Sequence, residues 1–400
     1  MISAPTAGDA ARHGTGTHQR ARRRLRAPAA LEAEITTAVD EWMTEGEVAV
    51  PGITLTVLLP SGDAVEIARG EGDLVAGTEV TPDDYFRIGS ISKTITTVAV
   101  LQLVDEGSID LDATVASYLG DEWMPPFELD GVDYRDAITI RQILSHTDGF
   151  PEFAWDPGFY LASSQRLDVP SEPEEILAWA AERGPLYVPG ENYEYNTVGH
   201  IAAGLVIEKV TGRTAAEVIR EGVFDPAGAG EGIYLPPEEA PPSPVVHGYA
   251  AGELKAQLGL LPALEQYKAA ASEAGDDYYD IAVAPQDFLE SVGWTGGGIE
   301  AQSAAVARIF RAMFDGTLLS KEMVTEMTTK NPYGNYALGI DVDDDGDTVA
   351  YSHGGGVPGF RSHAVYYPDL DIAIAMSVNM VPVDPDVGAL ADRLLELVSP

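Results

Sequence analysis

The chain contains no cysteine, and this absence excludes several classes of site. Without a thiol the protein forms no disulfide, holds no metal through a thiolate and has no cysteine nucleophile. Any nucleophilic chemistry must therefore use another side chain. The absence leaves the redox compartment open.

Basic residues are also scarce. The 400 residues include 24 Lys and Arg against 64 Asp and Glu, which gives a formal net charge of −40. Nucleic-acid binding needs a basic surface, and an anionic membrane repels an acidic protein, so we expect neither as a partner. We interpret the acidity as a property that favours solubility. We also expect no transmembrane helix.

The one basic segment is RARRRLRA, residues 20–27. A signal peptide would continue into an apolar stretch, but the sequence continues as PAALEAEITTAVDEW. That segment carries Glu32, Glu34 and Asp40 and predicts an amphipathic helix. We therefore interpret residues 1–28 as a disordered leader and, in the absence of a secretion signal, expect a cytoplasmic protein.

The order of predicted elements favours an α/β fold of the α+β sandwich type. A hairpin is expected over 52–73, because apolar and polar residues alternate on both sides of Ser61-Gly62-Asp63. Apolar periodicity, glycine and proline predict the other elements. Helices are expected over 29–47, 90–106, 138–150, 174–183, 197–221, 253–272 and 384–398. Residues 293–314 are expected to form a glycine turn followed by a helix, and strands are expected over 336–342, 348–353, 361–367 and 371–380.

This order predicts one antiparallel sheet flanked by the terminal helices, with a large helical insertion in the middle. Residues 29–110 and 290–400 would form the sheet domain, and residues 111–289 the mainly helical domain. A cleft between the two would be the natural binding site.

The segment FRIGSISKTITTVAVLQLVDEG, residues 86–107, places a lysine three residues after a serine, although the chain has only six lysines. Positions i and i+3 of a helix share one face, with Cβ atoms about 5–6 Å apart, so Ser90 and Lys93 can touch. Burial in the apolar run that follows would lower the pKa of the lysine and make it a base. A helix N-terminus also offers free N–H groups to an oxyanion.

The motif alone does not decide the function. On the order of one S-x-x-K is expected by chance in a chain of this length. Ser90 could equally cap the helix, with Lys93 facing solvent. On this motif alone we favour the second interpretation, so other segments must decide.

Two further segments favour the catalytic interpretation of Ser90 and Lys93. PGENYEYNTVGHIAAGLVIEKVTG, residues 189–212, places Tyr195 just before a long predicted helix. SHGGGVPGFRS, residues 352–362, is a strand end with a glycine run, and glycine lets a backbone approach a ligand closely.

In this order and at these spacings, the motifs resemble those of the class C β-lactamase and DD-peptidase family of serine hydrolases, and a related set is known from class A enzymes. The resemblance runs from about residue 36 to the C-terminus and includes the segments ITIRQILSHTDGF and GWTGGGIEAQSAAVARI. It implies the penicillin-binding-protein fold and its esterase, D-peptidase (carboxypeptidase) or transacylase branch.

The resemblance also implies residue roles. Ser90 is similar to the family's nucleophile, Lys93 to its partner base, and Tyr195 to the residue that passes a proton to the leaving group. The backbone N–H groups of Ser90 and Gly356 would form the oxyanion hole.

The third motif is the glycine segment. His353 stands where many relatives have lysine, and Gly354 and Gly355 would let the substrate lie along the strand edge. Arg361 could meet a substrate carboxylate, although a surface arginine is about equally plausible.

The second motif departs from the family pattern. It is usually Tyr-x-Asn, and here it is Tyr195-Asn196-Thr197. Threonine is shorter than asparagine and has one donor, while Asn196 would bind substrate only if the turn were rearranged. Together with His353, this departure points away from a dedicated β-lactamase. His146 and His200 are interpreted as structural.

The predicted function is that of a serine hydrolase that forms an acyl-enzyme with an ester or amide, from a small-molecule or peptide substrate. One alternative is a transacylase or cyclase that delivers the same acyl group to an amine or alcohol. Another is a penicillin-binding or sensor protein without turnover. We expect no cofactor and no metal, since the acidic segment DVDDDGD, residues 341–347, lacks the final glutamate of a calcium loop. The sequence leaves the oligomeric state open.

Overall fold

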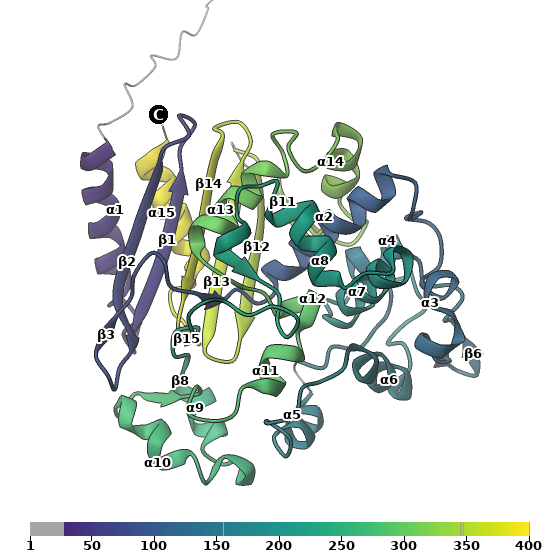
Figure 1. The fold of residues 1–400 in the computed structure, drawn as a ribbon, viewed down its shortest axis with the longest axis horizontal. Coiled ribbons are helices and arrows are strands. Elements are labelled where there is room, and N and C mark those ends of the chain that lie inside the picture. Colours follow the sequence, from purple (N-terminus) through teal and green to yellow (C-terminus); the bar gives the residue numbers. More distant parts are fainter. Residues whose placement is uncertain (1–27, 155, 345, 347, 400) are drawn as a thin grey trace, which may run out of the picture.

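The computed structural model describes residues 28–399 except 155, 345 and 347 (Figure 1). The leader predicted for residues 1–28 lies outside this part, apart from its last residue, where helix α1 begins. Seven strands form one antiparallel sheet in the order β11-β12-β13-β14-β1-β2-β3. Its strands are β1 (Gly52–Leu58), β2 (Ala64–Asp73), β3 (Thr78–Glu79), β11 (Asp341–Asp343), β12 (Ala350–Val357), β13 (Phe360–Tyr367) and β14 (Ile372–Val378).

The sheet is buried on both faces. On strand β1, Ile53, Leu55 and Val57 belong to a core that also includes the terminal helices α1 (Pro28–Trp42) and α15 (Val387–Val398). The alternate residues Thr54 and Thr56 face the opposite way and hydrogen-bond to Ser303 at the start of α13 (Ser303–Ala312). The predicted hairpin and the α/β sandwich with flanking terminal helices are therefore confirmed (Figure 1).

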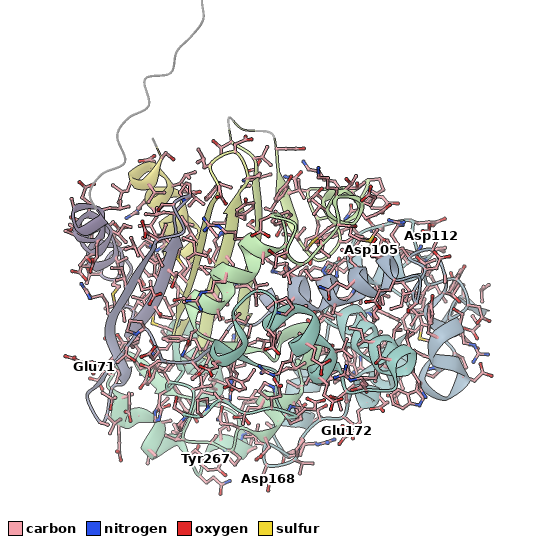
Figure 2. All side chains as sticks on the ribbon, turned by 45° about the horizontal axis from the view of Figure 1, so that its top comes forward. Glu71, Asp105, Asp112, Asp168, Glu172 and Tyr267 are labelled. Carbon is pink, nitrogen blue, oxygen red and sulfur yellow. The ribbon has the colours of Figure 1, made fainter. Side chains whose placement is uncertain are left out.

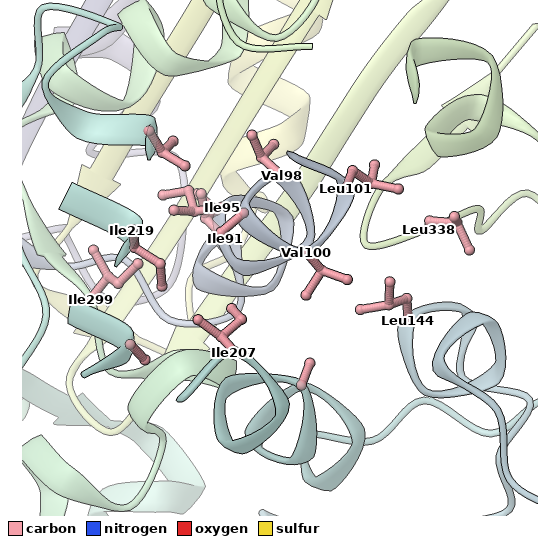
Figure 3. Close-up of a cluster of buried hydrophobic side chains, with 14 of the residues drawn as sticks. Ile91, Ile95, Val98, Val100, Leu101, Leu144, Ile207, Ile219, Ile299 and Leu338 are labelled. Atoms are coloured by element: carbon pink, nitrogen blue, oxygen red, sulfur yellow. The ribbon is translucent and has the colours of Figure 1, made fainter. Parts of the chain in front are cut away.

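Helix α2 (Ile91–Asp105) runs through the centre of the second core. Figure 3 shows Ile91, Ile95 and Val98 of this helix among apolar side chains from the helical insertion, including Ile207 and Leu144. The insertion and its neighbours consist of α3 (Val115–Trp123), α4 (Ile140–Ser145), α5 (Pro157–Ser163), α6 (Pro173–Arg183), α7 (Val198–Thr211), α8 (Ala215–Ile219), α9 (Gly252–Leu258), α10 (Lys268–Ala271), α11 (Asp287–Ser291), α12 (Trp294–Gly297) and α14 (Lys321–Thr328).

Short strands link the two regions. One small sheet consists of β4 (Phe86–Arg87), β10 (Glu300–Ala301) and β7 (Ile233–Tyr234). A second consists of β15 (Met380–Val381), β8 (Tyr249–Ala251) and β9 (Tyr278–Asp280), and a third of β5 (Glu128–Leu129) and β6 (Val132–Asp133). The division into a sheet domain and a helical domain stays a proposal, since the insertion shares its core with α2 and α13.

Several predicted elements differ in the structure. The helix predicted over 197–221 ends at Gly212, which adopts φ +68°, and a capping box at Thr214 starts the next one. The helix predicted over 253–272 is interrupted around Pro262. Of the strand predicted over 336–342, only its end belongs to β11, because Gly339 turns the chain with φ +66°.

Many of the acidic residues lie on the surface. Figure 2 labels Asp105, Asp112, Asp168 and Glu172, which are all exposed. None of the helices among the described residues combines the length and apolar character needed to cross a bilayer.

Candidate active site

Ser90 lies directly before α2 and makes no side-chain cap of that helix. Its Oγ instead accepts a hydrogen bond from Lys93 Nζ at 3.0 Å. Ser90 thus occupies the N-cap position without a side-chain cap, and the alternative in which Lys93 faces solvent is wrong, because Lys93 is 0% exposed.

Lys93 donates two further hydrogen bonds inside the protein. Its Nζ lies 3.1 Å from Thr197 Oγ1 and 2.7 Å from the carbonyl oxygen of Gly296. Burial lowers the pKa of Lys93 from 10.5 to about 8, against an opposing effect of the Glu152 carboxylate. Three hydrogen bonds fix the amine, and its reduced basicity makes the neutral, proton-accepting form accessible near neutral pH.

Tyr195 brings its phenol to the same serine. The hydroxyl hydrogen-bonds with Ser90, and burial raises the pKa of Tyr195, so the phenol stays protonated. Lys93 Nζ lies 4.9 Å from the centre of the tyrosine ring. The structure thus brings together Ser90, Lys93 and Tyr195 from segments that are more than a hundred residues apart in sequence.

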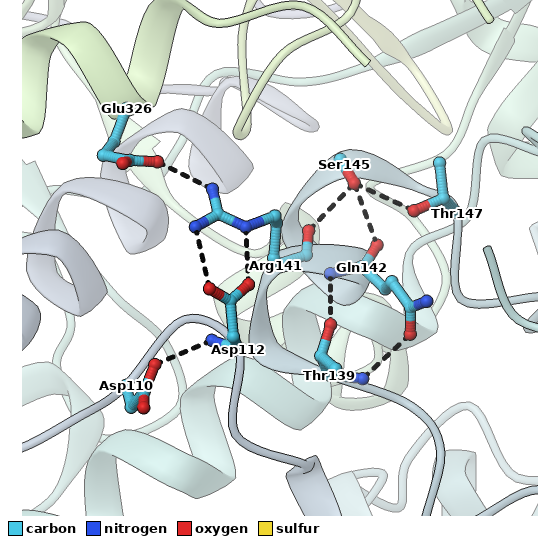
Figure 4. A network of polar contacts seen from close by, with 8 residues as sticks. All are labelled: Asp110, Asp112, Thr139, Arg141, Gln142, Ser145, Thr147 and Glu326. Carbon is cyan, nitrogen blue, oxygen red and sulfur yellow. Dashed lines mark hydrogen bonds and ion pairs between the residues drawn. The ribbon is translucent and has the colours of Figure 1, made fainter. Parts of the chain in front are cut away.

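A polar network around α4 supports this tyrosine. Figure 4 shows the Thr139–Gln142 capping box at the start of the helix and Arg141 paired with Asp112 and Glu326. The helix ends at His146, which adopts φ +58°.

The segment that holds Tyr195 packs against this helix end. The ring of His146 lies 4.4 Å from that of Tyr195, and its Nδ1 accepts a hydrogen bond from the Asn196 N–H at 3.4 Å. The carbonyl of His146 accepts from the Glu194 N–H. These contacts support the structural role expected for His146. His200 contributes to the same core, with Nε2 3.3 Å from Thr97 Oγ1.

Asn196 does not face the reacting groups. Its side chain is fully buried, its amide nitrogen donates to both carboxylate oxygens of Asp148, and its oxygen accepts from the Gly199 N–H. We therefore correct the prediction that Asn196 binds substrate: the turn is not rearranged, and this side chain holds the loop. Thr197 takes the position beside Lys93.

The glycine segment on β12 lies directly against the turn that carries the serine. A β-carbon at Gly355 would overlap the carbonyl oxygen of Ile88 and Ser362 Oγ, and one at Gly89 would lie 2.7 Å from the Gly356 nitrogen. Ser362 Oγ donates to the same Ile88 oxygen at 2.6 Å, which fixes the approach. The Gly356 backbone thus lies against the turn that leads into Ser90, as the predicted two-donor oxyanion hole requires.

His353 is a neutral hydrogen-bonding group in this site. Burial lowers its pKa to about 3. Its Nδ1 donates to the Gly354 carbonyl at 2.6 Å, so its Nε2 accepts from the Tyr336 hydroxyl at 3.0 Å. The ring lies 6.3 Å from that of Tyr195. A histidine held this way supplies no positive charge.

Arg361 pairs across the strand with Gly356, but its guanidinium is taken by another group. Its Nε and Nη2 both lie 3.0 Å from a carboxylate oxygen of Asp386, at the start of α15. The structure therefore gives Arg361 a structural partner, and the expected contact with a substrate carboxylate remains a prediction.

Sequence reasoning missed three residues of this site. Gly296, whose carbonyl holds Lys93, lies in the quoted GWTGGG segment, so the glycine run was an available signal. Tyr336 lies outside all of the motifs, so it could not be found from the sequence. Glu152 lies two residues after the SHTDGF segment, and its negative charge opposes the lowering of the Lys93 pKa and adds to the raising of the Tyr195 pKa.

The lowered pKa of Lys93 predicts a pH profile. Only the neutral amine can accept the serine proton, so kcat/KM for a neutral ester should rise about tenfold per pH unit on the acid side and level off near pH 8. Stopped assays from pH 5.5 to 9.5, corrected for hydroxide-catalysed hydrolysis, would measure it. A profile that is flat over this range would contradict the role of Lys93 as base.

Three comparisons with known proteins find similar sequences and similar structures. The family model named Beta-lactamase matches residues 19–399. Penicillin-binding protein 4 of Amycolatopsis lactamdurans is 32% identical over 189 residues, which cover 47% of this chain and 46% of that protein. The chain spans about half the length of the curated relatives it matches.

Solved structures match over nearly the whole chain. D-amino acid amidase from Ochrobactrum anthropi SV3, complexed with L-phenylalanine amide, superposes with a TM-score of 0.75 at 22% identity and covers 92% of this chain and 98% of its own. D-stereospecific amidohydrolase from Streptomyces sp. gives a TM-score of 0.70 at 26% identity, with coverages of 94% and 99%.

Proposed function

Because the chain belongs to the Beta-lactamase family, we propose that it is a serine hydrolase that forms an acyl-enzyme on Ser90 from ester or amide substrates. The observation that carries the proposal is the buried Lys93, hydrogen-bonded to Ser90 Oγ and lowered in pKa to about 8. A structural lysine would not need this combination, since burial of a cation is costly.

The first step follows from these contacts. Neutral Lys93 accepts the Ser90 proton as Oγ attacks the substrate carbonyl, and the N–H groups of Ser90 and Gly356 stabilise the oxyanion. Tyr195, which stays protonated, passes a proton from the lysine side to the leaving alcohol or amine as its bond to carbon breaks. Water then attacks the acyl-enzyme, loses its proton to the same groups, and Ser90 regains its hydroxyl hydrogen.

The substrate class is proposed from the site and the similar structures. Amides and esters both have the carbonyl that this chemistry needs, and the D-amino acid amidase and the D-stereospecific amidohydrolase have the same fold. We therefore propose amino-acid amides and esters as the first substrates to test. Thr197 and the neutral His353 weigh against efficient β-lactam hydrolysis.

The test combines mass spectrometry with product release. Intact protein would be incubated with a fluorophosphonate, with p-nitrophenyl acetate and with a penicillin, while p-nitrophenol is followed. We expect a fluorophosphonate adduct on Ser90 and rapid ester turnover. If none of the probes labels Ser90, the proposed function is wrong.

The same experiment separates the two alternative functions. A stable penicillin adduct without ester turnover would favour a penicillin-binding or sensor role, for which the similarity to Penicillin-binding protein 4 is the supporting observation. Adding hydroxylamine or an amine tests the acceptor: acyl transfer that outcompetes hydrolysis at millimolar amine would favour a transacylase.

A further inference from the structure

Tyr336 lies in the segment between α14 and β11 and is buried, with 4% of its surface exposed. Its hydroxyl hydrogen-bonds with His353 Nε2 at 3.0 Å. Its backbone is fixed as well, because its carbonyl oxygen accepts a hydrogen bond from the Asn331 N–H at 2.9 Å. The phenol is therefore held in one place beside strand β12, which carries His353.

The direction of this hydrogen bond follows from the other nitrogen of His353. A carbonyl oxygen can only accept, so Nδ1, which lies 2.6 Å from the Gly354 carbonyl oxygen, carries the imidazole hydrogen. Nε2 of the neutral ring is then an acceptor, and the Tyr336 hydroxyl donates to it. Burial raises the pKa of Tyr336 well above its ordinary value, so the phenol keeps the hydrogen that it donates. Both nitrogens of His353 thus have partners within the protein.

The ring of Tyr336 also adjoins the ring of Tyr195. The two ring centres lie 6.0 Å apart with their planes at 88°, an edge-to-face arrangement. His146 packs against both, with its ring centre 4.5 Å from that of Tyr336 and 4.4 Å from that of Tyr195. The ring of His353 lies 5.7 Å from that of Tyr336 and 6.3 Å from that of Tyr195. Tyr336 therefore contacts both Tyr195 and the imidazole that adjoins it.

The imidazole of His353 can compete for the hydroxyl hydrogen of Tyr195. In the proposed acylation step, Tyr195 directs its hydroxyl to Ser90 and then gives its proton to the leaving group. A neutral imidazole nitrogen is an acceptor, and a buried acceptor without a donor costs free energy. If Nε2 of His353 had no other donor, the Tyr195 hydroxyl would gain by turning toward it. The hydroxyl of Tyr336 removes this alternative.

We propose that Tyr336 is a positioning residue, whose hydroxyl occupies Nε2 of His353 and whose ring supports that of Tyr195. The Tyr195 phenol then stays directed toward Ser90 and gives its proton to the leaving group. This inference rests on the proposed function and adds a residue to its mechanism. Tyr336 acts through Tyr195 and His353, so its effect should depend on how much the leaving group needs a proton.

The first test compares two esters that share an acyl group and differ in the leaving group. p-Nitrophenolate departs as a stable anion without a proton, whereas an ethyl ester must receive one. Tyr336→Phe keeps the ring and removes the hydroxyl. We expect its kcat/KM, which reports acylation, to fall about 10- to 100-fold for ethyl butyrate and less than about threefold for p-nitrophenyl butyrate. A pH-stat measures the first reaction and p-nitrophenol absorbance the second.

Tyr333→Phe is the matched control, because it removes a phenol hydroxyl from the same segment. That hydroxyl is at an exposed position and donates to the Gly190 carbonyl oxygen at 2.7 Å. The ratio of its two kcat/KM values should equal that of wild type. An equal fall for both esters in Tyr336→Phe would overturn the inference and make Tyr336 a residue that only stabilises the fold. Wild-type turnover of p-nitrophenyl butyrate tests the proposed function separately, so the two failures are distinguishable.

Nitrogen NMR of isotope-labelled histidine tests the competition without turnover. The His353 signals are assigned by their loss in His353→Phe. Nε2 should be a hydrogen-bonded acceptor in wild type and also in Tyr336→Phe, since Tyr195 becomes its donor in the variant. In Tyr336→Phe/Tyr195→Phe it should become a free acceptor. A free Nε2 in Tyr336→Phe, or a bonded Nε2 in the double variant, would overturn the inference whether or not an acyl-enzyme forms.

Discussion

Replacing Ser90 by alanine is expected to lower kcat by about 10⁴-fold or more, because the acyl group then has no oxygen to join. The residual rate would come from the oxyanion hole and from substrate positioning. Lys93 would keep its bonds to Thr197 and Gly296, so the fold should persist. The thermal midpoint should change little, since the Ser90 side chain does not cap α2.

The measurement pairs ester turnover with fluorophosphonate labelling and thermal unfolding. Ser61→Ala, in the exposed turn between β1 and β2, serves as the control and should keep wild-type turnover and labelling. Retention of labelling in Ser90→Ala would place the nucleophile elsewhere and refute the proposed mechanism.

A second large effect is expected at Gly355. Alanine there would place its β-carbon inside the Ile88 carbonyl oxygen and Ser362 Oγ. To remove this overlap the β12 backbone must move away from the turn before Ser90, because a backbone oxygen cannot rotate aside. We expect a loss of about 2–4 kcal/mol in the free energy of unfolding, at or above the usual cost of overpacking, together with at least a 100-fold fall in kcat/KM.

The adjacent residue provides the control. A β-carbon at Gly354 would come no closer than 4.0 Å, to the Ser362 carbonyl oxygen. Gly354→Ala should therefore change the free energy of unfolding by less than about 1 kcal/mol. Urea unfolding of the two variants, with kcat/KM on a p-nitrophenyl ester, measures the difference. Similar behaviour of both variants would show that the close approach at Gly355 is not required.

Much of the fold could be predicted because its signals are local. The alternation around Ser61-Gly62-Asp63 fixes the β1–β2 hairpin, and the apolar run after Ser90 fixes α2. Helix breaks were harder to predict. Gly212 and His146 end helices through left-handed conformations, and after Gly212 the apolar pattern resumes within a few residues.

The site could be predicted only as far as its motifs reach. Ser90, Lys93 and Tyr195 lie in recognisable segments, and the structure brings them together. Tyr336 and Glu152 depend on tertiary placement. The Tyr336 hydroxyl meets Nε2 of His353, and Oε2 of Glu152 is buried with no hydrogen-bond donor among the residues that the structure describes. No spacing rule encodes either feature.

The order of strands in the sheet also has a consequence for how the protein becomes active during synthesis. Strand β1 pairs with β14, and the turn before Ser90 rests on Gly355, so both contacts join the first quarter of the chain to the last. The ribosome delivers these partners hundreds of residues apart. We therefore expect the active site to stay unformed in the nascent chain until the final strands emerge. Ser90 and Lys93 should have no hydrolytic activity before that point.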